Sequence, residues 1–559
     1  MTLLRARCLY LAACGCATLR LGFTRTEPMQ SANRPLWSVG VRMLAAAVTL
    51  LSASALQHAD AAVVVSSGTT QNMTCSGGVC APTAANAVLN AGDLENLLAS
   101  GNVEITTTGA GVQAKDIDVK APFGWSSGSA LALDASKSIA IDKAVSVSGT
   151  AAVSLTTGKK GTLSFGGKGN VTFASLSSSL TINGAAYTLT DSIKSLASAI
   201  ASNPSGDYAL AASYDASQDG IYTSSPIPTT FAGSFEGLGN AISNFSMGAS
   251  YDTNEGFFAE LGASGTIANF GLLNANVGSS VRRATLGAMV GSSDGTITNS
   301  YATGNLVDAQ ADTLGGMVGQ NNGTMARCHA AVAIAHTIAS AGGLVGYSVG
   351  PVSSSSATGD VQSRGTAGGL IGENDAAITD SFATGAVTGE FAGGLVGLNY
   401  GPIADSYSSG NVSTRNRRGA SGGLVGAAGG AISNSYATGD IRGVTGAWVG
   451  GLVGANDAAI SDSYSTGAPS GGSYTGGLIG YDETEAGSLS DTYWDTTTSG
   501  ITDLSQGAGN IANDPGITGL STQELQSGLP TGFEPTIWSE NGDIDDGLPY
   551  LLALPPKRR

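Results

Sequence analysis

The sequence predicts an all-β protein built as a right-handed parallel β-helix. Between about residues 256 and 494, the phrase Gly-Gly-Leu-Val/Ile-Gly recurs, followed by a short polar turn and Ile-x-Asp/Asn-Ser-Tyr. The second half of this phrase alternates like a β-strand, and no copy has the hydrophobic period of an amphipathic helix. No copy is long enough to bury its own apolar residues. A repeat of this kind therefore indicates a solenoid, whose core forms only when successive copies stack.

The last glycine of each phrase marks the repeat and recurs every 25 to 29 residues. The marked positions are Gly291, Gly319, Gly346, Gly372, Gly397, Gly426, Gly454 and Gly480. A degenerate copy opens at Gly256. Two or three short strands are expected in each copy, paired with the neighbouring coils at roughly 4.8 Å. The glycines suit corners where the chain adopts a positive φ or passes close to the next coil.

The chain begins with a predicted secretory signal over residues 1–61. An apolar run at residues 43–56 follows Arg34 and Arg42, and a small-residue motif ends at Ala61. This order predicts cleavage after Ala61 and a secreted, cell-surface or outer-membrane location. The run is too short to span a bilayer, which needs about 20 apolar residues.

Alternative interpretations of the first residues concern where the chain starts and how it is cleaved. The residues before the apolar run are interpreted either as an extended signal or as the product of a misassigned start, with Met29 as the true first residue. A lipoprotein cleavage box at Leu11-Ala12-Ala13-Cys14 competes with the signal, but its own apolar run is short.

Cysteine usage agrees with export. Cys75 and Cys80 flank the flexible loop Ser-Gly-Gly-Val, which can close a small disulfide in an oxidising compartment. A metal site at this pair would need two more ligands, and no histidine lies nearby. Cys328 is expected to stay free, because it lies hundreds of residues from this pair, in the middle of a coil. It aligns with the serine of the repeat, and His329 with the tyrosine, so we interpret both as variants of repeat positions and not as a reactive site.

Residues 62–232 are predicted to form a β-rich region in which the solenoid begins with less similar coils. A short helix is expected over residues 93–98, followed by strands with period-two alternation such as Leu131/Leu133 and Ile139/Ile141. Residues 191–202 have helical spacing, with Asp191 as the expected N-cap. The repeats then occupy residues 233–497.

Residues 498–559 are predicted to form a C-terminal cap and tail, which a solenoid needs at its open end. Ser521 and Glu524 fit a capping box at the start of a short helix. Aromatic and aliphatic residues that follow, such as Phe533 and Trp538, provide apolar cover.

Three columns of side chains follow from the alignment of the copies. Asp380, Asp405, Asp462 and Asp491 share one position with Asn299 and Asn434. We interpret this column as a turn or hydrogen-bonding ladder; a carbohydrate- or calcium-binding stripe and a catalytic carboxylate pair are the alternatives. Asn321, Asn374, Asn399, Asn456 and Asp482 form a second column, which fits left-handed turn positions. Tyr301, Tyr407, Tyr436 and Tyr464 form a candidate surface column.

The copies resemble the GLUG repeat, which occurs in large secreted bacterial proteins such as filamentous-haemagglutinin-like adhesins and some IgA-peptidase passengers. Residues 180–239 also resemble the segment that precedes GLUG repeats in filamentous-haemagglutinin-like exoproteins. The resemblance implies an adhesin that attaches to host or neighbouring-cell glycans or proteins, exported with an outer-membrane secretion partner. One departure concerns that export route, since the Asn-Pro-rich secretion domain of two-partner exoproteins is not found at the mature N-terminus.

Little in the sequence points to catalysis. The only histidines are His58, His329 and His336, and none begins the zinc motif of the IgA-peptidase metalloproteases. Asp543-Ile544-Asp545-Asp546-Gly547 lacks the distal glutamate of a calcium loop. We therefore expect no catalytic residues, metal or cofactor, and a non-enzymatic protein. The formal net charge of −17 also excludes nucleic acid as a favoured partner. An extracellular polysaccharide-binding or polysaccharide-degrading β-helix protein is the alternative function.

Overall fold

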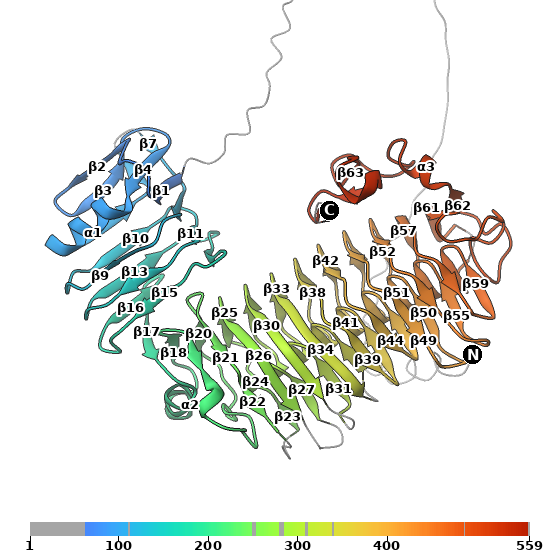
Figure 1. Ribbon diagram of the computed structural model, residues 1–559, viewed down its shortest axis with the longest axis horizontal. Coiled ribbons are helices and arrows are strands. Elements are labelled where there is room, and N and C mark those ends of the chain that lie inside the picture. The colour runs from blue at the N-terminus through green and yellow to red at the C-terminus, as the bar shows by residue number, and fades with distance from the viewer. Residues whose placement is uncertain are drawn as a thin grey trace, which may run out of the picture. The chain divides into compact units, whose positions relative to one another are not determined.

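The computed structural model describes residues 62–109, 112–248, 253–278, 284–307, 311–337, 340–485 and 487–556. These residues form an all-β parallel solenoid of about 16 turns with three α-helices (Figure 1), which confirms the predicted fold class. None of these helices is long and apolar enough to cross a membrane. The predicted signal, including the cleavage position Ala61, lies outside the described residues.

The solenoid begins near the start of the described chain. Strand β1 (Ala62–Ser66) pairs in parallel with β4 (Ala87–Asn90) and β8 (Asp116–Val119), and the ladder continues through β11 (Ile139–Ile141) to β14 (Leu163–Phe165). Alternate residues of most of these strands are buried, as the period-two pattern predicts. The inward residues form one hydrophobic core for these first coils.

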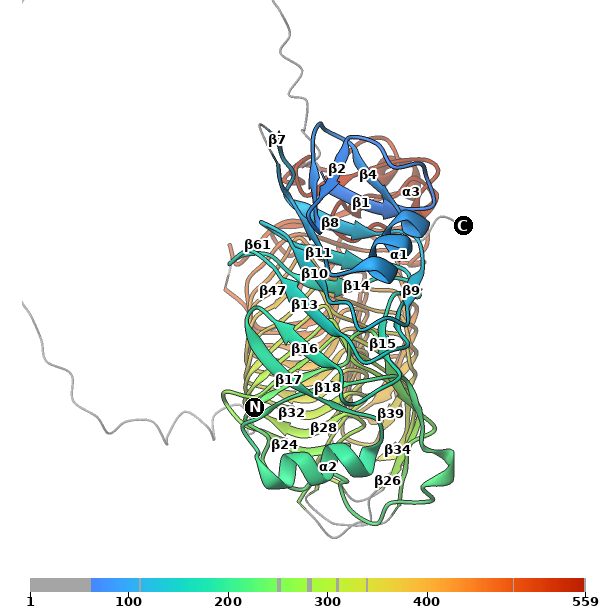
Figure 2. The same ribbon diagram turned by 90° about the vertical axis from the view of Figure 1, so that its left-hand side faces the viewer.

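Two helices pack on the outside of the coils (Figure 2). Helix α1 (Ala91–Ser100) begins at the N-cap Asn90, whose side chain accepts hydrogen bonds from two backbone N–H groups. Helix α2 (Ile193–Ser202) is capped by Ser192 instead of the expected Asp191, because Ser192 and Ser195 form a reciprocal capping box. Three apolar residues of α2 are buried in the core of the following coils, so the helix covers apolar side chains of those coils.

The repeats form nine coils with an almost fixed register. Two of the sheets contain nine strands each, running from β23 (Asn254–Glu255) to β59 (Tyr474–Gly476) and from β24 (Phe258–Leu261) to β60 (Ile479–Asp482). The Val/Ile residue of each phrase lies directly beside the same residue of the next coil; examples are Val345 with Ile371 and Ile371 with Val396. The repeat phrase therefore occupies one place in every coil.

The closing glycines are required by close approach between coils. A β-carbon added at Gly372 would lie 2.6 Å from the carbonyl oxygen of Gly346, and one at Gly397 would lie 2.8 Å from that of Gly372. Such distances do not occur for real β-carbons, and the clashing atoms are backbone, which cannot move aside. None of the eight marker glycines adopts a positive φ, so of the two expected reasons only close approach applies to them.

The second polar column forms a hydrogen-bonded ladder inside the solenoid, which corrects its predicted place at left-handed turns. Asn321, Asn374, Asn399, Asn456 and Asp482 are all nearly or completely buried, and none has a positive φ. The side-chain amide of Asn374 donates to Asn399 Oδ1 at 2.8 Å and to the Ala376 carbonyl at 2.6 Å. These bonds join coil to coil and satisfy polar groups that water cannot reach.

The C-terminal segment folds back along a side of the last coils. After β61 (Leu489–Asp495) and β62 (Ile517–Leu520), helix α3 (Thr522–Leu525) begins at Ser521 with the predicted capping box to Glu524. The segment continues through β63 (Trp538–Ser539) and β64 (Tyr550–Leu551). Its residues Phe533, Trp538 and Leu551 form a separate hydrophobic cluster with four tyrosines of the repeats. The cap thus covers a lateral face as well as following the last coil.

Replacing Asn374 with leucine should destabilise the repeats. The change removes both donated hydrogen bonds and leaves buried acceptors unpaired, at a cost of about 1–3 kcal/mol. Asn322→Leu is the control, because Asn322 is exposed and bonds only at the surface. Chemical unfolding followed by circular dichroism measures both variants. Equal unfolding midpoints for the two would show that the ladder does not stabilise the coils.

Replacing Trp538 with alanine should release the cap without unfolding the coils. Trp538 is 1% exposed, and truncating such a side chain costs about 3–5 kcal/mol. Hydrogen exchange should become faster across residues 521–556 and stay unchanged in the repeats. Leu552→Ala, at a residue that is 47% exposed, should change neither. Unchanged exchange in the cap of Trp538→Ala would contradict the packing described above.

Candidate functional site

The tyrosine column is buried, which corrects its predicted place at the surface. Tyr407, Tyr436 and Tyr464 stack face to face, with ring centroids 4.9 and 5.2 Å apart, and are 8%, 1% and 0% exposed. The C-terminal segment covers them, and Tyr464 donates a hydrogen bond to the Pro549 carbonyl at 2.5 Å. Burial raises the pKa of Tyr436 and Tyr464 well above the ordinary value. Tyr301, which lies on the earlier strand β30 (Tyr301–Val307), is half-buried.

The aspartate column provides the left-handed turns of the repeats. Its members Asn299, Asp380, Asp405, Asn434, Asp462 and Asp491 all have φ between 46° and 51°. Aspartate and asparagine tolerate this backbone conformation better than other residues with a side chain, which agrees with the turn interpretation. Burial, followed by the nearby Asp380 carboxylate, raises the pKa of Asp405. Within the described ranges, no three His, Cys, Asp or Glu side chains are placed together to hold a metal ion.

The cysteines occupy two different environments. A disulfide joins Cys75 and Cys80 across the hairpin of β2 (Met73–Ser76) and β3 (Val79–Pro82). Cys328 is free and buried in the serine position of its coil, and burial raises the pKa of its thiol to about 12. The imidazole of His329 lies 2.9 Å from Ser356 Oγ, whereas the Cys328 thiol lies 3.5 Å from the carbonyl oxygens of Ile297 and Ala326. The side chain of His336 lies outside the described residues.

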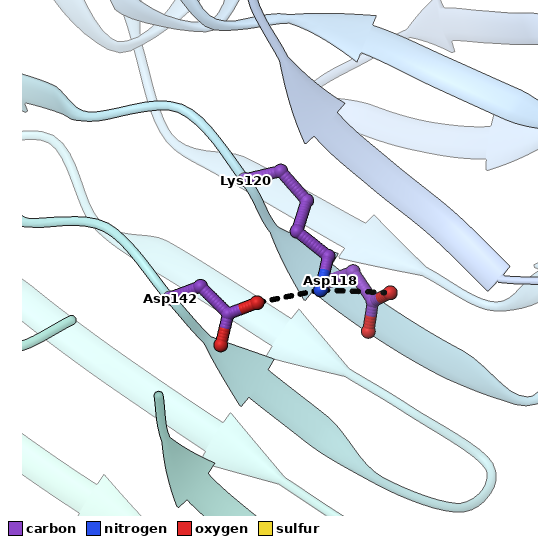
Figure 3. A network of polar contacts seen from close by, with 3 residues as sticks. All are labelled: Asp118, Lys120 and Asp142. Carbon is purple, nitrogen blue, oxygen red and sulfur yellow. Dashed lines mark hydrogen bonds and ion pairs between the residues drawn. The ribbon is translucent and has the colours of Figure 1, made fainter. Parts of the chain in front are cut away.

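A small charged network lies on the first coils (Figure 3). Lys120 Nζ lies 2.5 Å from Asp142 Oδ2 and 3.7 Å from Asp118 Oδ2, and all three side chains are partly exposed. Burial raises the pKa of Asp118, and the Lys120 charge opposes this shift. The network connects one coil to the next, and an exposed ion pair of this kind stabilises a fold by at most about 1 kcal/mol.

Three aromatic rings gather on the outer face of the last repeats. Trp448 on β55 (Trp448–Gly450) lies directly beside Tyr474 on β59. The Tyr481 ring, on β60, stacks on Trp448 with centroids 4.7 Å apart and an interplanar angle of 17°, and meets Tyr474 edge-on at 5.1 Å. Tyr474 is 41% exposed, and the other two rings are partly exposed. The cluster thus presents flat apolar surface to solvent.

The coils next to this cluster carry four exposed arginines: Arg415, Arg417, Arg418 and Arg442. The first three lie in the loop between β49 (Val412–Thr414) and β50 (Ala420–Gly422). The backbone N–H of Trp448 donates a hydrogen bond at 3.0 Å to the carbonyl of Gly419, the residue after Arg418. Among the described residues, none of the four guanidinium groups has an ion pair with a carboxylate. We call the three rings and four arginines together the aromatic–arginine surface.

Sequence reasoning missed this surface because its members come from different strands, and most coils have no aromatic residue at these positions. A signal was present, however. Trp448 stands beside Ala420, and Tyr481 stands beside Ala455, so each ring replaces an alanine of the preceding coil. The arginine loop lies in the longest copy, between the marker glycines Gly397 and Gly426.

Comparison with known proteins identifies the repeat motif. The family model of the GLUG motif matches residues 418–442. Among curated proteins none matches this chain. A solved structure named IgA1 protease is 21% identical with a TM-score of 0.34, and the match covers 44% of this chain and 22% of that one. A structure from Bacteroides ovatus, whose name contains the words immunoglobulin A1 protease, is 17% identical with a TM-score of 0.28, covering 62% and 85%.

Two expectations from the sequence change with these comparisons. Nothing in them supports the filamentous-haemagglutinin-like family specifically. The prediction of a non-enzymatic protein is also corrected, because both structures carry the name of a protease. That prediction rested on missing sequence motifs, and such motifs test only catalytic arrangements that are already known. The chain is a parallel β-solenoid that carries the GLUG motif.

Proposed function

We propose that this chain is an exported β-solenoid adhesin that attaches to carbohydrate chains on a cell or matrix surface. The observation that carries the proposal is the ring cluster of Trp448, Tyr474 and Tyr481, in which Tyr474 is exposed and the other two rings are partly exposed. A pyranose ring has a face of C–H groups that packs against a flat aromatic ring. Exposed aromatic groups that gather on one face of a soluble protein are typical of binding sites.

The structure of the repeats favours an extended partner. The cluster spans adjacent coils, since Trp448 and Tyr474 lie on neighbouring strands of one sheet and Tyr481 on the next sheet. Consecutive sugars of a polymer would meet rings held on rigid strands, so binding would order few protein groups. Attachment becomes multivalent when many copies of the protein on one surface bind the same polymer.

Export is part of the proposal. The basic, apolar and small-residue order of residues 1–61 is that of a secretory signal, and the disulfide between Cys75 and Cys80 suits an oxidising compartment. A secreted or cell-surface location follows from this interpretation. The partners on the target surface would be host or neighbouring-cell glycans.

Binding to a panel of neutral and acidic polysaccharides tests the proposed function. The exported chain should bind at least one polymer. The double variant Trp448→Ala/Tyr474→Ala should bind it at least about tenfold more weakly, which corresponds to the loss of about 1.4 kcal/mol. Tyr400→Ala is the matched control, since Tyr400 is 48% exposed and lies outside the cluster.

If the exported chain bound no polysaccharide, or if the double variant bound as tightly as the control, the carbohydrate proposal would be wrong. A reducing-sugar assay on the same mixtures distinguishes attachment from cleavage, because cleavage of a glycosidic bond releases a new reducing end.

A further inference from the structure

We propose that the aromatic–arginine surface selects acidic polysaccharides, with the arginines binding the carboxylate groups of sugars that stack on the rings. This inference rests on the proposed function and specifies its ligand class. The surface combines two chemistries, an apolar ring cluster and a group of cations, and a uronic-acid polymer carries both complementary features on one repeating unit.

The arginines lie where they can reach a ligand on the rings. A β-carbon added at Gly446 would lie 2.6 Å from the Arg417 carbonyl oxygen and 3.0 Å from Arg417 Cβ, so the Arg417 backbone packs against the loop that leads to Trp448. Arg418 precedes Gly419, which accepts the Trp448 N–H. Arg442 lies opposite Ser413, two residues before Arg415. The backbone positions of the four arginines therefore lie in or beside the segments that lead into β50 and β55.

The local charge is opposite to that of the whole chain. The formal net charge is −17, yet four arginines gather within two successive coils. Carboxylates also lie near these residues: Asp440 stands two residues before Arg442, and its Oδ1 accepts the Ala468 N–H at 3.2 Å. The backbone carbonyl of Glu390 accepts the Ala420 N–H, and Glu483 follows Tyr481 by two residues. Among the described residues, none of these carboxylates forms an ion pair with the four arginines. A planar guanidinium binds a carboxylate through two parallel hydrogen bonds, so free arginines beside flat rings fit an acidic sugar.

The acidic remainder of the chain restricts the partner. A nucleic acid or an anionic membrane extends over a wide area, so it would also face the acidic remainder of the surface and be repelled by it. A single polysaccharide chain is narrow enough to contact the patch alone. Rings and arginines then act together, since the rings provide packing and the arginines provide charge selection.

The test uses hyaluronan, polygalacturonate and alginate, each beside its carboxyl-reduced form, which keeps the pyranose chain and loses the charge. The exported chain should bind at least one acidic polymer at least about tenfold more tightly than the reduced form. Arg415→Gln/Arg417→Gln/Arg418→Gln should remove this difference and leave binding of the reduced polymer unchanged. Raising the salt from about 0.1 M to about 1 M should weaken only binding of the acidic form.

A charge-matched variant controls for net charge. Lys159→Gln/Lys160→Gln/Lys168→Gln removes the same number of cations from exposed positions of the first coils and should bind like the unmodified chain. Equal behaviour of the two triple variants would overturn the inference. So would equal binding of acidic and reduced polymers, which would still leave the proposed function intact.

Failure to bind any of the six polymers would overturn the inference, and failure on the whole neutral and acidic panel would remove the proposed function as well. Tighter binding to phosphatidylserine vesicles than to any polysaccharide would assign the arginines to a membrane surface instead and would contradict the inference.

Discussion

The structure depends on how closely one coil can approach the next. Every strand of the repeats takes its backbone partners from the neighbouring coils, so a coil that stands away from its neighbour loses a whole row of hydrogen bonds. The glycines at positions such as Gly372 exist because any side chain there would strike backbone atoms of an adjacent coil. The amide ladder through Asn374 and Asn399 uses the same short separation, which places an amide within hydrogen-bond distance of its counterpart.

This regular stacking also determines where the molecule can vary. Inside the coils, each side chain packs against the side chains at the same position in the neighbouring coils, so a substitution must fit the same small space. Cys328 is tolerated there because it is close in size to serine. On the outside, one coil can differ from the next at little cost in stability. The aromatic–arginine surface is such a difference, because Trp448 and Tyr481 take positions that alanine occupies in the preceding coil.

Much of the fold followed from the sequence, because period and alternation report directly on coil length and on which strand face is buried. The parallel solenoid, its repeat positions and the capping box at Ser521 were predicted in this way. The alignment could not tell the two polar columns apart, because Asn and Asp serve both left-handed turns and buried ladders. It also placed Tyr436 and Tyr464 outside, since nothing local in the repeats reveals that residues 521–556 fold back over them. The ring cluster was missed because it joins residues from separate sheets.

Hydrogen exchange of the purified chain, with and without a bound acidic polysaccharide, tests most directly whether the solenoid presents one defined carbohydrate-binding surface. The structure predicts slower exchange on binding at residues 415–420, 442–448 and 474–481, with little change in the first coils or in the C-terminal segment. Protection spread evenly over the repeats, or confined to residues 62–190, would contradict this account.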